Sequence, residues 1–224
     1  MLTLIMALSL IGCGSKGPEI LGVYDATLDL KDAFVESIDN EMMVDISFGE
    51  YVEKFELVLV TEFNEDGTYK QYVDMEKFEV TCEKLKDETK VYLEDVLVEM
   101  LKQEYTALNP SLELNTKEDV EAYMGMTMDQ MANLALGMNL SDFADALIDE
   151  SFGTDMFAEE VLSEGNYKAE DGKLYMSESL DTAIDEEVYE VYTIKGDVVT
   201  ITEGVNMEQD DLIVYPFELI KRAN

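Results

Sequence analysis

The feature that most constrains this fold is the spacing of its apolar residues, which changes along the chain from that of strands to that of helices and back again. Residues 20–73 and 166–220 contain short stretches in which apolar and polar residues alternate, the pattern of half-buried strands. Between them, from about 75 to 163, apolar residues recur at roughly helical spacing. The strand-forming parts of the chain therefore lie on both sides of one helical block.

Alternation and turn residues together predict eight strands. The run Asn64-Glu65-Asp66-Gly67 is typical of a hairpin, because Asp-Gly supplies a positive-φ position. Pro216 cannot donate a ladder hydrogen bond and therefore predicts a sheet edge or a bulge. The expected strands are residues 20–30, 54–63, 68–73, 166–169, 173–176, 187–194, 198–203 and 212–220.

Start and stop signals predict several helices. Asp74 is a good N-cap, Thr116 with Asp119 forms an imperfect capping box, and Gly137 is a natural residue to follow a helix end. The pair Asn109-Pro110 should end the helix that begins at Asp74. The expected helices are residues 31–42, 74–105 (as one helix or two), a helix headed by residue 116, 127–136, and a helix starting at 141.

Hairpin-linked antiparallel strands favour an up-and-down barrel, and eight strands can enclose either packed side chains or one small ligand. We therefore expect an α+β fold: an antiparallel eight-stranded lipocalin-like β-barrel with a helical insertion between strands three and four. Residues 20–224 would form this single barrel domain, with the insertion at about 75–163. The rival arrangement is a sheet domain plus a separate helical bundle. The split of the strands across the block disfavours that rival.

Charge excludes several functions. The chain has 51 acidic and 15 basic residues, a formal net charge of -36. Such a charge repels nucleic-acid phosphates and anionic lipid head groups, so DNA, RNA or membrane binding through a basic patch is excluded. Between Gln103 and Tyr167 there are fourteen acids and one basic residue, Lys117. The plain interpretation is a solvated acidic surface, and the sharper one is binding of cations or of a cationic partner.

The absence of histidine excludes further chemistry. It removes Ser-His-Asp and Cys-His catalysis and the commonest transition-metal ligand. Acid clusters could bind calcium, and the loops 64–67 and 208–211 are the candidates for such a site. Neither loop has the ligand spacing of an EF-hand. We expect no metal, no cofactor and no catalytic residues. A hydrolase that uses only two carboxylates remains a minor alternative.

The first residues carry an apolar run that is too short to span a membrane. Residues 1–12 contain no charge, and Cys13 and a Gly/Ser/Pro-rich stretch follow. Leu10-Ile11-Gly12-Cys13 resembles the lipobox of bacterial lipoproteins. The resemblance implies a signal peptide at 1–12, a lipid on Cys13, a tether at 13–19, and a protein anchored to the cell membrane and facing away from the cytoplasm. The alternative is a buried N-terminal strand or helix with an incidental cysteine.

Short motifs in the strand regions are similar to those of lipocalins. Gly22-Val23-Tyr24 resembles the Gly-x-Trp signature with tyrosine in place of tryptophan, and the hairpin from Phe63 to Tyr69 resembles one found in lipocalin-like bacterial lipoproteins. The chain has no tryptophan, whose ring normally plugs one end of a lipocalin barrel. The resemblance implies a small surface-tethered barrel and does not cover the helical block.

Two non-catalytic functions follow as hypotheses. In the first, the barrel binds a small apolar ligand under a cap made by the helices, which hold five methionines in fifteen residues. Apolar faces and the methionine cluster select the candidate lining residues Tyr24, Phe55, Leu57, Leu59, Tyr69, Met124, Met128 and Met131. The bland alternative is that these methionines only fill gaps. In the second, the acidic helical surface binds a protein partner in the cell envelope and the barrel supports it.

Overall fold

The structure is a computed structural model that describes residues 19–41, 45–152, 161–207 and 214–223. Cys13, the signal segment 1–12 and the loop 208–211 therefore lie outside the described residues. Eight antiparallel strands form a closed barrel in which every strand pairs with its sequence neighbours and β8 pairs back with β1. The strands are β1 Gly22–Asp29, β2 Glu56–Phe63, β3 Thr68–Val73, β4 Ser163–Glu170, β5 Lys173–Met176, β6 Tyr189–Lys195, β7 Val198–Val205 and β8 Phe217–Lys221.

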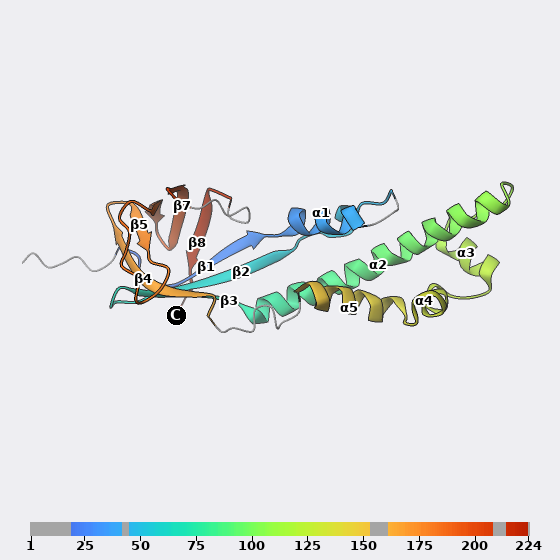
Figure 1. Ribbon diagram of the computed structural model, residues 1–224, viewed down its shortest axis with the longest axis horizontal. Helices are drawn as coiled ribbons and strands as arrows, with labels where there is room; N and C mark the ends of the chain where they lie inside the picture. Colours follow the sequence, from blue (N-terminus) through green and yellow to red (C-terminus); the bar gives the residue numbers. More distant parts are fainter. Residues whose placement is uncertain (1–18, 42–44, 153–160, 208–213, 224) are drawn as a thin grey trace, which may run out of the picture.

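The expected α+β barrel with a helical insertion between strands three and four is confirmed. The helices are α1 Lys31–Glu41, η1 Phe48–Glu50 (a 3-10 turn), α2 Met75–Leu108, α3 Lys117–Met124, α4 Met128–Leu136 and α5 Leu140–Phe152. We call residues 75–152, which hold α2 to α5, the helical arm. Figure 1 shows the arm extending away from the barrel along the long axis of the molecule.

Helix α2 is one helix of 34 residues. At 1.5 Å per residue it is about 51 Å long, far longer than a barrel strand. Asp74 caps it as expected, with its side chain accepting a hydrogen bond from the backbone N–H of Lys77, and Asn109 ends it. Helices α3 and α4 both carry complete reciprocal capping boxes, and both end at a left-handed glycine, Gly125 and Gly137.

Several expected boundaries were wrong, among them the start of β4, which begins at Ser163 and not at residue 166, and the start of β6, which begins at Tyr189 and not at residue 187. Two of the others have local explanations. Helix α5 begins at Leu140 and not at Ser141, because Asn139 accepts a hydrogen bond from the N–H of Asp142 and Asp129 accepts one from the N–H of Leu140. The last strand begins at Phe217, directly after Pro216, so the proline stands before the ladder and marks neither an edge nor a bulge within it. A register irregularity occurs instead in the β6–β7 pair at Val191/Tyr192.

The described residues have two hydrophobic cores. The barrel core contains Ile20, Tyr24, Ala26, Phe63, Tyr69, Tyr167, Ala169, Leu174, Tyr192, Val199, Ile201 and Leu219. The arm core is built by α2 to α5 together with α1, η1, the start of β2 and the end of β3. Leu59 packs against both cores, so the two are continuous at this residue of β2.

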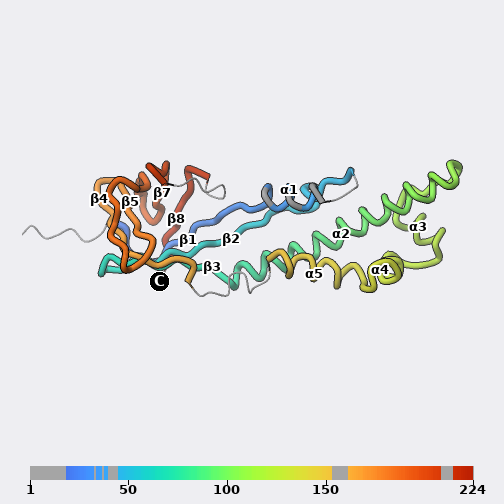
Figure 2. The backbone as a smooth tube through the Cα atoms, viewed as in Figure 1, coloured from blue at the N-terminus to red at the C-terminus, as the bar shows by residue number. Residues whose placement is uncertain are grey.

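The segment between β1 and β2 fastens the arm at its middle. Phe48 in η1 packs its ring 4.9 Å from that of Tyr92 in α2, and the hydroxyl of Tyr51 donates to Asp95 at 2.7 Å. Farther in, Phe34 of α1 stacks edge-on against Phe152 at the end of α5. The backbone trace in Figure 2 shows α1 and α5 alongside the barrel-proximal part of α2. The first half of the arm is thus clamped, whereas its far end carries only α3, α4 and the last turns of α2.

Candidate functional site

The predicted lining residues do not converge on one cavity. Tyr24 and Tyr69 belong to the barrel core, and Leu59 lies where the two cores meet. The other five, Phe55, Leu57, Met124, Met128 and Met131, belong to the arm core or pack against it. The arm extends away from the barrel, so the methionine cluster does not lie over a barrel mouth (Figure 1). The gap-filling interpretation of the methionines fits this placement, because Met128 and Met131 are buried against other helices.

The barrel interior is filled by aromatic side chains. Tyr24, Phe63 and Tyr167 pack in sequence, with ring centroids 5.9 Å and 4.8 Å apart. Two of the tyrosine hydroxyls inside the barrel are anchored to the backbone: that of Tyr167 donates to the carbonyl oxygens of Ile20 and Asn64, and that of Tyr69 to the carbonyl of Ser177. These rings occupy the volume that a lipocalin-type ligand would need. The chain has no tryptophan, and tyrosines anchored by their hydroxyls fill the interior of the barrel instead.

One carboxyl group is buried in the barrel wall. Glu190 of β6 is only 9% exposed, and burial raises its pKa above the ordinary value, partly offset by a hydrogen bond donated by the Tyr215 hydroxyl at 3.1 Å. Gly204, which pairs with Glu190 across the ladder, makes room for that ring, because a Cβ there would lie 2.6 Å from the Tyr215 oxygen. Glu190 alone does not make the pair of acids that carboxylate hydrolysis needs.

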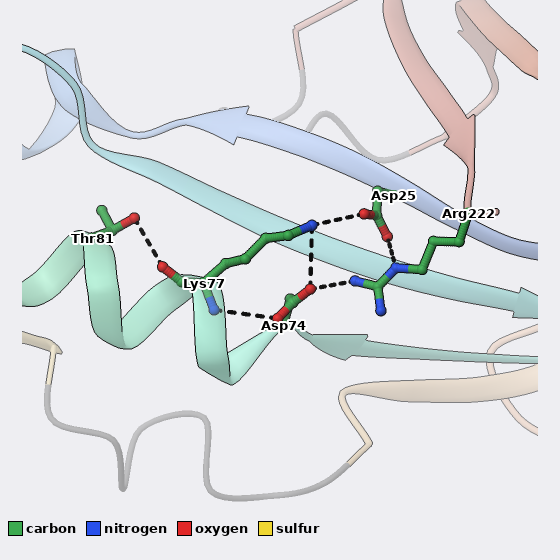
Figure 3. Close-up of polar contacts among 5 residues, drawn as sticks. All are labelled: Asp25, Asp74, Lys77, Thr81 and Arg222. Carbon is green, nitrogen blue, oxygen red and sulfur yellow. Dashed lines mark hydrogen bonds and ion pairs between the residues drawn. The ribbon is translucent and has the colours of Figure 1, made fainter. Parts of the chain in front are cut away.

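An ion-pair network joins the barrel to the arm. Lys77, in the first turn of α2, contacts Asp25 of β1 at 2.9 Å and Asp74 at 3.4 Å. Arg222, which follows β8, binds the same two carboxylates from the opposite side. Figure 3 shows the four groups alternating in sign on the outer wall of the barrel. We call Asp25, Asp74, Lys77 and Arg222 the joint.

In the joint each acid is paired with both basic residues, and these pairs affect the pKa values. Burial alone would raise the pKa of Asp74, but hydrogen bonds from the Lys77 N–H, the Lys77 ammonium and the Arg222 guanidinium outweigh it, so the pKa lies below its usual range. The hydrogen bond to Asp25 and the charges of both acids raise the pKa of Lys77. Asp74, Lys77 and Arg222 are therefore charged at neutral pH. The joint fixes the direction in which α2 leaves the barrel.

The arm beyond Gln103 is strongly acidic. Residues 104–152 contain ten acids and one lysine, Lys117, and that lysine is already paired with Glu94 at 2.7 Å. None of the helices α2 to α5 carries a basic residue in its last turn, so their negative ends have no positively charged side chain of their own there. The charge of this region is thus negative almost without compensation.

Large apolar side chains are exposed on the same region. Leu134 is 79% exposed and Leu136 is 49% exposed, although both lie on the short helix α4. The buried residues of α4 are Met128, Met131 and Ala132, at the spacing of one helical stripe, and Leu134 falls off that stripe. An open surface hollow of about 450 Å³ adjoins it, lined by Asp129, Gln130, Asn133, Leu134 and Asn139. We call these five residues the α4–α5 corner.

Sequence reasoning missed both the corner and the joint. The sequence predicted the helix 127–136 and the acidic bias of the region, but not which apolar residues of that helix face water. A helical projection anchored on the stripe that begins at Met128 separates Leu134 from it, so a signal existed. For the joint, Asp74 was found as a cap, but its partner Arg222 lies 148 residues away and no local pattern connects them.

The other considered sites have structural explanations. In the loop 64–67, Asp66 accepts hydrogen bonds from the N–H and hydroxyl of Thr68, which lowers its pKa and completes the hairpin turn. Cys82 is half-buried on α2, and desolvation raises its thiol pKa to about 11, the opposite of what a nucleophile requires. No group of three or more His, Cys, Asp or Glu side chains arranged for a metal ion occurs within the described ranges.

The fold places the chain among closed eight-stranded antiparallel barrels with an inserted helical arm. The sequence matches no protein-family model, no curated protein and no solved structure. In the part of the chain that the structure covers, no helix combines the length and the apolarity needed to cross a membrane.

Proposed function

We propose that this protein is a lipid-anchored bacterial surface lipoprotein and a non-catalytic interaction module, which holds its acidic helical arm away from the membrane for a protein partner. The observation that carries the proposal is topological. In this barrel the start of β1 lies at the opposite end from the β3–β4 connection that contains the arm (Figure 1). A lipid on Cys13, six residues before Glu19, would hold the barrel by the end that faces away from the arm.

Two further features support this function over ligand storage. The interior of the barrel is packed with anchored tyrosines, so the barrel is suited to be a rigid base. The net charge of -36 repels anionic head groups, which favours an arm that stands off the membrane surface. Helix α2 alone adds about 51 Å of reach.

Lipid anchoring is tested by Cys13→Ser in the expressed precursor. We expect the parent protein to fractionate with membranes and to enter the detergent phase on Triton X-114 partitioning, and the variant to do neither, because one thiol carries the whole anchor. Ser15→Ala is the matched control and should behave as the parent does. Equal membrane partitioning of the parent and the Cys13 variant would reject the anchor.

The interaction role is tested by placing a photo-crosslinking amino acid at Ala135 on α4, which is exposed, and at Ala183 on the barrel, which is also exposed. On whole cells of the host we expect a discrete adduct from position 135 and none from position 183. Absence of any adduct from the arm would remove the support for an interaction module.

A small apolar ligand in the barrel is the second candidate, since the closed eight-stranded barrel is the architecture that holds such ligands elsewhere. Here a ligand would have to displace the rings of Tyr24, Phe63 and Tyr167. Native mass spectrometry of protein purified gently from its host separates the two functions. A defined molecule at near-stoichiometric occupancy would make the protein a carrier, whereas an empty barrel leaves the arm as the functional surface.

A further inference from the structure

The α4–α5 corner has features that a general acidic surface lacks. Its hollow is bounded on one side by the apolar side chain of Leu134 and on the others by the polar groups of Asp129, Gln130, Asn133 and Asn139. Leu136, two residues further along α4, is also exposed, but it points to another face of the helix and does not line the hollow. Such a combination can bury an apolar side chain and neutralise a cation at the same time.

The charge around the hollow selects the sign of the partner. Asp129 is the acid that lines the hollow, and its Oδ1 accepts a hydrogen bond from the N–H of Leu140 at 3.3 Å. The C-terminal end of α4 contributes the partial negative charge of unpaired carbonyls, with no lysine or arginine in its last turn. Asp142, in the first turn of α5, is a second acid close to the end of α4 in sequence. Its carboxylate accepts a hydrogen bond from the side-chain amide of Asn139 at 2.7 Å. The nearest lysine in sequence, Lys117, is occupied by Glu94.

The same charge excludes other occupants. A second copy of the chain would bring another net charge of -36 to an acidic corner. Nucleic acid and anionic lipid are repelled for the same reason. A purely polar cation would leave Leu134 in water, whereas an apolar residue this exposed at the edge of a hollow contributes binding free energy only when it is covered.

We propose that the α4–α5 corner docks a basic amphipathic segment of a partner protein, an α-helix whose one face interleaves lysine or arginine with leucine-type side chains. The long stem of a lysine or arginine lies along Leu134 while its charged end reaches Asp129 and the carbonyl end of α4. The apolar side chains of the segment cover Leu134. This inference rests on the proposed role of the arm as an interaction surface, and it adds the chemistry of the partner and the place where it binds.

The test is a direct titration of the full chain, purified in neutral detergent, with three synthetic 18-residue peptides. One is an amphipathic Lys/Leu helix, one has the same lysines with serine in place of leucine, and one is an amphipathic Glu/Leu helix. We expect the Lys/Leu peptide to bind saturably with one site, the Lys/Ser peptide to bind at least about tenfold more weakly, and the Glu/Leu peptide not to bind.

Variants assign the binding to the corner. Leu134→Ser keeps every charge and removes the exposed leucine, and we expect it to weaken the Lys/Leu peptide about tenfold without changing the Lys/Ser peptide. Asp129→Asn keeps an oxygen to accept the Leu140 N–H and removes the charge, so it should weaken both lysine peptides severalfold. Leu180→Ser is the control, because Leu180 is 48% exposed on the barrel, and it should bind as the parent does.

Each contrary result is informative. Equal affinity of the parent and the Leu134→Ser variant for the Lys/Leu peptide, or equal binding of the Lys/Leu and Lys/Ser peptides, would overturn the docking site and leave only diffuse charge attraction. A dimer that depends on Leu134 in light scattering would overturn it in favour of a second copy. If position 135 still crosslinks to a partner in cells while no basic peptide binds, the interaction module stands and its proposed partner chemistry is wrong.

Discussion

At the scale of single residues, Glu190 is the carboxyl group of the described residues whose pKa burial raises above the ordinary value. Burial raises its pKa, so the ionised form is less favourable in the folded chain than in the unfolded chain. A raised carboxyl pKa stabilises the fold below the unfolded value and loses that contribution as pH rises through the folded value. At neutral pH Glu190 is therefore a net cost to stability, and Tyr215 recovers part of it.

We predict that Glu190→Gln raises the free energy of unfolding at pH 7 by about 1 kcal/mol, because glutamine has no charge to desolvate and its carbonyl oxygen can still accept from Tyr215. The gain should shrink as pH falls through the carboxyl range, where Glu190 becomes neutral too. Urea unfolding followed by circular dichroism at pH 7 and pH 4 measures both values. A variant that is less stable than the parent at pH 7 would contradict the assignment.

At the scale of elements, caps and the joint decide where helices begin and how the arm leaves the barrel. Asp74 does two things at once: it caps α2 through the Lys77 N–H and binds Lys77 and Arg222 through its carboxylate. The helix start and the barrel wall are thereby connected through one side chain. Capping was predictable from local sequence, and the connection to Arg222 was not.

We predict that Arg222→Met lowers the free energy of unfolding by about 1 kcal/mol at low salt, since the joint is partly exposed and ion pairs of this kind contribute modestly. The difference from the parent should shrink in 1 M salt, where screening acts within about 3 Å. It should also shrink below about pH 4, because the lowered pKa of Asp74 means that its contribution is present above the unfolded value and is lost as pH falls.

The matched control for the joint is Lys54→Met. Lys54 pairs only with Glu56 at 3.1 Å and is 65% exposed, so its removal should change stability by no more than a few tenths of a kcal/mol. Denaturant titrations of the parent and both variants at 0.1 M and 1 M salt provide the comparison. Equal losses in Arg222→Met and Lys54→Met would mean that the joint does not hold the arm.

At the scale of the whole molecule, the question is whether barrel and arm unfold together. The two cores meet at Leu59, and Leu57 and Val73 carry barrel strands into the arm core. The segment around η1 adds contacts from the β1–β2 connection to the middle of α2. These connections predict one cooperative unit despite the elongated shape.

We therefore predict that Leu85→Ala, a change at a fully buried residue of the arm core, lowers the free energy of unfolding by about 3 kcal/mol through loss of apolar burial and the cavity left behind. The helical signal at 222 nm and the near-ultraviolet signal of the barrel tyrosines should shift together. A shift of the helical signal alone would show that the arm unfolds independently. Val91→Ala, at an exposed residue of the same helix, is the control and should change little.

Much of the fold could be predicted because its signals are local. Alternation identified all eight strands, and β3 was found to the residue, since burial of one face imposes a period of two. Capping residues located α2, α3 and α4, because unsatisfied backbone groups at helix ends select particular side chains. The start of α5 and the start of β8 were missed by short distances, where Asn139 and Pro216 act on neighbours in ways that periodicity does not record.

The sequence by itself determined the barrel, the insertion between strands three and four, and the acidity of the arm, because period, turns and charge are properties of neighbouring residues. Tertiary structure alone decided that the arm extends away from the barrel, that Tyr24 and Met128 belong to different cores, and that Arg222 meets Asp74. Those facts depend on the direction in which α2 leaves β3, and that direction is fixed by packing and ion pairs between residues far apart in the chain.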